Sequence, residues 1–276
     1  MRMWIVPVIF FMLFAAQARD KKDIVHKHQF STNKFLRAGE KLVYDGSAPR
    51  LGILGRRIGK IYLDTKSDKL VSGKRCYRVD LRLELSEVLS SIYKYGALIS
   101  SVLEYKKFRF LVYSKNDQKK DEGRFEKAIV DYVDKTIYYK RYRKGQKGAT
   151  SEIKMDHDVL VDPLSLIYFF RALDFKGHSG QTFTFHIFNR GKILKVSIDY
   201  VRTQIEINKK KRTVIHIKPS KATRGALIRK RDVELYLDPE TRIPLLIRIL
   251  GIPIVGRLEL ELAESNSPAL KLKREK

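Results

Sequence analysis

The sequence predicts a mainly β protein, in which an antiparallel sheet is curled into a roll or incomplete barrel with one short helix near residues 162–173. Two observations lead to this fold class. Short segments of alternating apolar and polar residues recur along the chain with charged turns between them, and long helical periodicity is almost absent. About a dozen strands in one flat sheet would leave long exposed edges, so the sheet is expected to curl or close.

The chain begins with features of an export signal. Arg2 supplies a positive charge, Trp4–Ala16 is an unbroken run of 13 apolar residues, and Ala16-Gln17-Ala18 matches a signal-peptidase site. The run is too short for a bilayer core, which needs roughly 20 residues, so an uncleaved anchor is the weaker alternative. We expect residues 1–18 to be removed after Ala18 and the protein to reach the periplasm.

The remaining chain divides by composition. Residues 19–34 are polar and charged and predict a flexible leader, residues 35–264 predict a single all-β domain, and residues 265–276 form a basic tail. Lys115–Gly123 predicts a solvated hairpin tip. Glu87–Leu103 fits neither the helical nor the strand period.

The clearest strand is Tyr77–Leu85, where apolar residues alternate with Arg78, Asp80, Arg82 and Glu84. Such alternation places one face on a core and the other in water. Similar runs predict the remaining strands: Lys41–Tyr44, Ile58–Leu63, Phe108–Tyr113, Ala128–Val133, Thr136–Tyr142, Phe183–Phe188, Ile193–Val201, Thr203–Ile207, Val214–Ile217, Val233–Leu237, Leu245–Ile249 and Leu258–Leu262.

Two local signals fix a hairpin and the helix. Asn189-Arg190-Gly191 lies between two strand-like runs and predicts a tight turn, with Gly191 at positive φ. Asp162 is a good N-cap, and Pro163 suits the first helical position, where no N–H is needed. From Leu164 to Leu173 only Ser165 and Arg171 are polar, so the helix is expected to be buried, with Arg171 at the favourable end of the helix dipole.

Cysteine content and charge limit the class of protein. Cys76 is the single cysteine, which excludes an intramolecular disulfide, and its place in a strand predicts a buried side chain. Lys and Arg total 57 against 31 acidic residues, a net charge of +26. A field of this size attracts polyanions. Because the export signal removes the chain from nucleic acid, we expect the anions of the cell envelope: lipid phosphates, lipopolysaccharide or acidic glycans.

Three basic clusters are the candidate anion-binding sites. The first interleaves cations with tyrosines, the second caps a predicted hairpin, and the third lies near Arg224. Solvated hairpin tips are the alternative for each cluster, unless the fold gathers them at one rim. Their residues are Lys140, Arg141, Arg143 and Lys144; Lys210, Lys211 and Arg212; and Arg229, Lys230 and Arg231.

No catalytic or metal motif emerges. Gly177-His178-Ser179-Gly180 is not a G-x-S-x-G elbow and predicts a polar turn. Asp156-His157-Asp158 and the His26/His28 pair lack the spacing of a metal frame. Asp80 and Glu84 alternate with arginines, which favours ion-paired strand decoration over a glycosidase pair. We therefore expect no enzyme activity, catalytic residue, metal or cofactor.

Three stretches in this order resemble a bacterial exported family, catalogued as domain of unknown function 3108. They are Phe35–Asp45, the Asp162-Pro163-Leu164-Ser165 helix start and Leu235–Pro244. The resemblance covers about Phe35 to Glu264. It implies a periplasmic, mostly antiparallel β protein without an established reaction. The matching residues serve as turn, cap and strand-register positions: Gly39, Glu40, Asp162, Pro163, Asp238 and Pro239.

The sequence thus predicts a non-catalytic periplasmic protein that binds an anionic envelope lipid, lipopolysaccharide or glycan. The alternative is a structural or interaction protein of an outer-membrane assembly or transport machine. An envelope hydrolase with His157 and Asp158 in its site is a weaker third hypothesis, and nucleic acid is not an expected partner.

Overall fold

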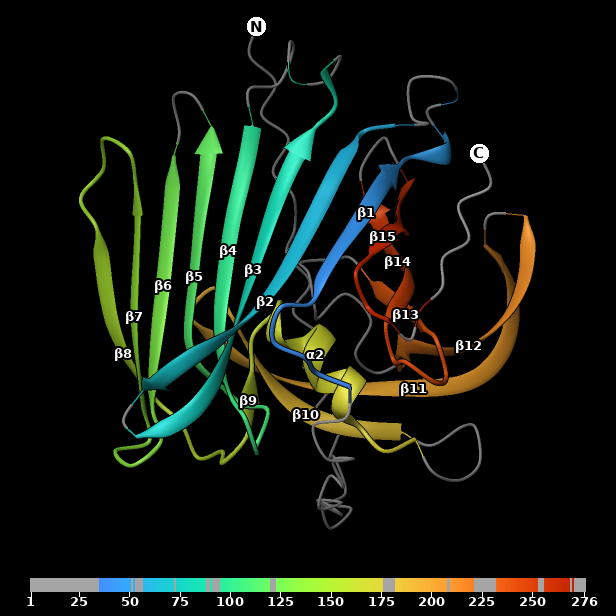
Figure 1. The fold of residues 1–276 in the computed structure, drawn as a ribbon. Coiled ribbons are helices and arrows are strands. Elements are labelled where there is room, and N and C mark those ends of the chain that lie inside the picture. The colour runs from blue at the N-terminus through green and yellow to red at the C-terminus, as the bar shows by residue number, and fades with distance from the viewer. Residues whose placement is uncertain are drawn as a thin grey trace, which may run out of the picture.

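The computed structural model describes residues 35–50, 52, 57–71, 73–87, 90, 95–119, 123–175, 182–207, 209–220, 232–252, 256–268 and 270. The signal segment and the leader lie outside these residues. Within these residues, one 15-stranded sheet wraps around one short helix, α2 (Figure 1). The elements are β1 Lys41–Ser47, β2 Gly59–Val71, β3 Lys74–Leu85, β4 Tyr95–Glu104, β5 Phe110–Lys119, β6 Arg124–Asp131, β7 Thr136–Arg143, β8 Ala149–Lys154, β9 Leu160–Val161, α2 Ser165–Ala172, β10 Thr182–Asn189, β11 Lys192–Ile207, β12 Lys210–Pro219, β13 Val233–Leu237, β14 Pro244–Ile252 and β15 Gly256–Ser265.

The sheet is an antiparallel meander in which the first strand also pairs with the last. β1 lies between β2 and β15, so the strand order runs from β8 through β1 and β15 to β9. The sheet remains open between β8 and β9, and β9 pairs in parallel with β10. This confirms the predicted incomplete barrel with one helix.

Several predicted boundaries were wrong. Ile193–Val201 and Thr203–Ile207 are one strand, β11, which pairs continuously with β12. Val196, Ile198 and Tyr200 are its buried residues in the first part, whereas the odd-numbered residues are the more buried ones beyond Tyr200. The alternation therefore breaks while the backbone continues. Lys115–Lys119 belongs to β5 and is not a hairpin tip. The ambiguous region contains β4, and β8 was not predicted because all its residues but Ile153 are exposed.

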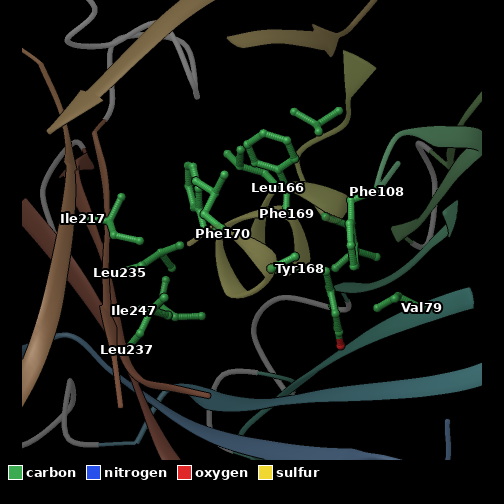
Figure 2. Close-up of a cluster of buried hydrophobic side chains, with 14 of the residues drawn as sticks. Val79, Phe108, Leu166, Tyr168, Phe169, Phe170, Ile217, Leu235, Leu237 and Ile247 are labelled. Carbon is green, nitrogen blue, oxygen red and sulfur yellow. The ribbon is translucent and has the colours of Figure 1, made fainter. Parts of the chain in front are cut away.

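The core lies inside the curl and centres on α2. Figure 2 shows side chains of the helix lying between Ile217, Leu235 and Ile247 on one side and Val79 and Phe108 on the other. Phe169 and Phe170 each lie 5.5 Å, between ring centroids, from Phe185 of β10. The buried helix therefore packs against both halves of the sheet and joins them.

Cys76 is buried within β3, as predicted. In the described part of the chain, no helix is both long enough and apolar enough to cross a bilayer.

Candidate functional site

An apolar cavity of about 520 Å³ lies inside the curled sheet, next to α2. Its walls come from both halves of the sheet and its floor from the helix. The volume is within the range of roughly 300–1,000 Å³ that small-molecule sites occupy. Two charged residues, Lys115 and Arg190, are among the described residues that line it; the others are Tyr44, Gly46, Ile58, Gly59, Ile61, Leu63, Leu81, Leu83, Leu85, Ala97, Ile99, Pro163, Leu164, Leu166, Ile167, Phe170, Ile187, Val233, Leu235, Ile247, Ile249, Leu258 and Leu260.

The apolar walls follow from strand alternation. Residues directly opposite each other in neighbouring antiparallel strands point to the same face of the sheet. Leu63 of β2 pairs with Leu81 of β3, which pairs with Ile99 of β4. Each strand thus adds one aliphatic side chain to the same inner row, and the predicted strand pattern of Tyr77–Leu85 is part of it.

The floor is held by the start of α2. The Asp162 Oδ1 atom accepts hydrogen bonds from the backbone N–H groups of Leu164 at 2.8 Å and Ser165 at 3.0 Å, and its backbone oxygen accepts one from Leu166. Helical geometry begins at Leu164–Ser165, but these bonds place the cap at Asp162, as predicted. The Ser101 hydroxyl donates to Asp162 Oδ2 at 2.5 Å, which ties the helix to β4. Burial raises the pKa of Asp162 despite these bonds.

The other end of α2 is held by a buried ion pair. Arg171 donates to both carboxylate oxygens of Glu40 and to the backbone oxygen of Phe35. The side chains of Arg171 and Glu40 are 1% and 4% exposed. The helix can therefore neither slide nor turn without leaving a buried charge unpaired, so the cavity floor is fixed.

The inner row changes from apolar to charged at β5. Ile99 pairs with Lys115, Lys115 with Glu126 of β6, and Glu126 with Arg141 of β7. The next row continues from Ala97 in the same way. We call the resulting inner surface of β5–β7 the charged wall: Lys115, Asp117, Arg124, Glu126, Arg141 and Arg143.

The β10–β11 hairpin brings one more cation to this wall. Arg190 and Gly191 form the tight turn at φ +52° and +77°, which confirms the predicted hairpin. The turn lies against Tyr139 of β7, because a Cβ atom on Gly191 would be 2.9 Å from the Tyr139 ring. Phe188 of the same hairpin packs edge-on against Tyr139, with 5.5 Å between ring centroids.

Tyr139 marks the point where these charges meet. Burial and the Glu126 carboxylate raise the pKa of Tyr139 to about 12, while Arg141 and Arg190 act in the opposite direction. The phenol is therefore neutral at physiological pH. Its oxygen is buried and close to the Glu126 carboxylate, but no described residue meets it in full hydrogen-bond geometry. Of the two cations that act on this phenol, Arg190 lines the apolar cavity, and a cation there is suited to an anionic group attached to an apolar body.

The sequence profile of a family described as "Protein of unknown function (DUF3108)" matches residues 44–263. The chain belongs to this family. The match confirms the resemblance seen in the three motifs. No curated protein matches the chain.

A solved structure shares the fold of this DUF3108 protein. It is the crystal structure of a beta-barrel-like protein of the domain of unknown function DUF1849 from Brucella abortus, with a TM-score of 0.51 and 9% sequence identity. The match covers 84% of this chain and 98% of that chain. At this identity the similarity concerns the fold alone.

The fold of the DUF3108 chain separates the predicted basic clusters. Arg141 and Arg143 belong to the charged wall, whereas Lys140 points to the outer face of β7. Lys144 lies in the exposed turn after β7. Lys210, Lys211 and Arg212 begin β12 on the opposite flank of the molecule (Figure 1), and Arg229, Lys230 and Arg231 lie outside the described residues. The first two clusters thus do not share a rim, and the position of the third is outside the described structure.

The other candidates remain scattered. Asp156 pairs with exposed Lys135 at 2.9 Å, and the His157 ring stacks on His186 with 3.6 Å between centroids. No group of three or more potential metal ligands occurs among the described residues. The Gly177–Gly180 turn and the His26/His28 pair fall outside the described residues.

The ion pairs predicted on β3 are present. Asp80 accepts from Arg78 and Lys66 at 2.9 Å each, and Arg82 lies 3.2 Å from Glu84. Desolvation raises the pKa of Asp80, but hydrogen bonds from Ser100, Lys66 and Arg78 outweigh it, so the net shift is downward. The charged side chains on this face of β3 therefore balance one another in ion pairs.

Sequence reasoning missed the most useful residues in the DUF3108 chain. Lys115 was placed in a hairpin tip, and Arg190 was treated as a turn residue. A period-two count carried from Leu111 through Tyr113 to Asp117 would have put Lys115 on the inner face. Glu40 was assigned to a turn by resemblance, but it is the buried partner of Arg171. No sequence signal joins these two residues, which are 131 positions apart.

Proposed function

We propose that this protein is a non-catalytic periplasmic binding protein for an anionic amphiphile of the cell envelope. The observation that carries the proposal is the 520 Å³ cavity, apolar except for Lys115 and Arg190. An acyl or alkyl chain matches the aliphatic walls, and a phosphate or carboxylate head group matches the two cations. The cavity favours a lipid over a glycan, because a glycan offers no comparable apolar surface.

The two cations differ in whether a nearby carboxylate already balances their charge. Lys115 Nζ lies 3.1 Å from Asp117 of the same strand, so part of its charge is already balanced. Arg190 is exposed and takes part in no ion pair within the described chain. Arg190 is therefore the main contact for the head group, and Lys115 is the second cation of the same cavity.

Calorimetric titration with single-chain amphiphiles, below their micelle concentrations, tests the proposal. We expect dodecyl phosphate to bind, and Ala97→Phe to weaken binding at least about tenfold, because Ala97 lines the cavity and phenylalanine fills it. Ala149→Phe is the matched control, since Ala149 is exposed on edge strand β8. Absence of binding, or equal effects of the two variants, would overturn the proposal.

A second candidate function is supported by the open edge of the sheet. Among the described strands, β8 is hydrogen-bonded to β7 alone, and it is exposed along nearly its whole length. Such an edge can add a strand from another protein. An interaction protein of an envelope machine would be crosslinked through β8 to one protein partner, and Ser151→Pro would abolish that crosslink without affecting amphiphile binding.

A further inference from the structure

The outer face of β6 and β7 carries an exposed pattern of aromatic, aliphatic and basic side chains. Three cross-strand pairs form it, since facing residues of the two strands project together. The aromatic pair stacks, with 5.2 Å between the Phe125 and Tyr142 ring centroids. We call this surface the β6–β7 face, defined by the pairs Phe125/Tyr142, Lys127/Lys140 and Ile129/Tyr138.

The central pair is the unusual one. Lys127 and Lys140 oppose each other directly, and both are exposed. Like charges in this position repel. Neither lysine is in an ion pair with any residue that the structure describes; the acid nearest to them by register on this face is Glu152 of β8, which is opposite Tyr138. Two facing cations without a carboxylate between them favour an external anion.

The outer face of β2 and β3 offers a comparison within the same sheet, because its charged side chains form ion pairs. There Asp80 is shared between Lys66 and Arg78, and Glu84 pairs with Arg82. The positive charge of the β6–β7 face is therefore not a general property of the sheet surface.

Exposed apolar residues gather on the same part of the molecule. The large hydrophobic residues that stay exposed in the described chain all belong to β4, β6, β7 and the β6–β7 turn. Such residues, next to lysines, are typical of surfaces that enter the head-group region of a bilayer, where tyrosine rings keep their hydroxyl groups in water. They are Leu98, Ile129, Val133, Tyr138 and Tyr142, exposed to between 41% and 88%.

We propose that the β6–β7 face docks on an anionic membrane surface. Lys127 and Lys140 bind lipid phosphates, while Tyr138, Tyr142 and Ile129 insert between the head groups. A bilayer is favoured over a soluble polyanion because the face extends over two strands and alternates apolar with basic side chains. The inference does not depend on the cavity, because none of the residues of the β6–β7 face lines it.

Vesicle sedimentation tests this docking. Purified protein is mixed with phosphatidylcholine vesicles, with and without phosphatidylglycerol; all variants share one N-terminus, so any contribution of residues 4–16 is constant. We expect binding only to the phosphatidylglycerol vesicles. Lys127→Glu with Lys140→Glu should weaken it at least about tenfold, and Tyr138→Ser with Tyr142→Ser should weaken the binding that persists in high salt.

Lys211→Glu with Lys218→Glu is the matched control, because it reverses two exposed lysines of β12 and changes the net charge equally. Equal loss in the control and in the Lys127/Lys140 variant would show diffuse attraction and overturn the proposal. Binding to heparin with the same residue dependence, but not to vesicles, would replace it with a glycan site. Dodecyl phosphate titration of the Lys127/Lys140 variant should match wild type, which separates this result from the cavity proposal.

Discussion

Arg171 and Glu40 form a bidentate ion pair, with Nη1–Oε2 at 2.5 Å and Nη2–Oε1 at 2.8 Å, although 131 residues separate them. Burial by itself would lower the pKa of Arg171, but the Glu40 carboxylate more than offsets this and the pKa rises. The Arg171 guanidinium therefore stays charged inside the core. The pair joins the last turn of α2 to the segment before β1, and so fixes the cavity floor to the strand that closes the meander.

Removing one partner of this pair should destabilise the fold strongly. Arg171→Met leaves the Glu40 carboxylate buried without a counter-ion, and we expect a loss of about 3–5 kcal/mol in the free energy of unfolding. The double variant Glu40→Leu/Arg171→Met contains no buried charge and should recover much of that loss. Urea denaturation measures both. A double variant no more stable than Arg171→Met would show that the ion pair itself is not the source of the loss.

Asp162 should make the stability of the folded protein depend on pH, whereas an asparagine at this position should not. Its pKa is raised in the folded state by burial, so folding favours the protonated form. The contribution of Asp162 to stability is therefore largest below the unfolded pKa of about 3.9, and it falls as the pH rises toward the folded pKa.

Asp162→Asn keeps the cap to Leu164 and Ser165 and cannot ionise. Its stability relative to wild type should therefore increase between acidic and neutral pH, as measured by urea denaturation at several pH values. Asp162→Ala loses the cap as well as the ionisable group, and it should be about 2 kcal/mol less stable than Asp162→Asn across the same range. A stability difference between Asp162→Asn and wild type that is constant with pH would contradict this account.

The contact between the β10–β11 hairpin and β7 can be isolated with two glycines. Gly191 and Gly73 have nearly equal backbone angles, φ +77° and +76°, so alanine introduces similar backbone strain at both. A Cβ atom meets the Tyr139 ring at Gly191 and nothing within 4 Å at Gly73. We expect Gly191→Ala to cost about 1–3 kcal/mol more than Gly73→Ala in urea denaturation. Equal costs would mean that the hairpin moves freely away from Tyr139.

The fold class could be predicted from sequence because it depends on local signals. Alternation gave most strands, Asp162 and Pro163 gave the helix start, and Asn189-Arg190-Gly191 gave the hairpin, since each of these is decided within a few residues. The boundaries failed where burial changed face, as after Tyr200, or where a strand lay exposed at the edge, as β8 does.

The candidate site was harder to predict because it depends on register between distant strands. Consecutive residues of a strand point to opposite faces of the sheet, so a run of cations is divided between them. Lys140 and Arg141 therefore point in opposite directions. Lys115 joins Arg190 only through the curl of the sheet, which no local pattern specifies. Cation density in the sequence therefore pointed to β7 but could not separate its inner face from its outer face.

A final prediction compares Arg190, which lines the cavity, with Lys140 on the outer face of β7. If Arg190 binds the head group, Arg190→Gln should weaken dodecyl phosphate binding about tenfold and flatten its dependence on salt, because an exposed cation attracts an anion less as salt screens it. Binding of the uncharged dodecyl maltoside should not change. Lys140→Gln removes the same charge from the outer face and should leave both titrations as in wild type. Equal effects of Arg190→Gln and Lys140→Gln on dodecyl phosphate would show that net charge, and not a site beside Tyr139, attracts the amphiphile.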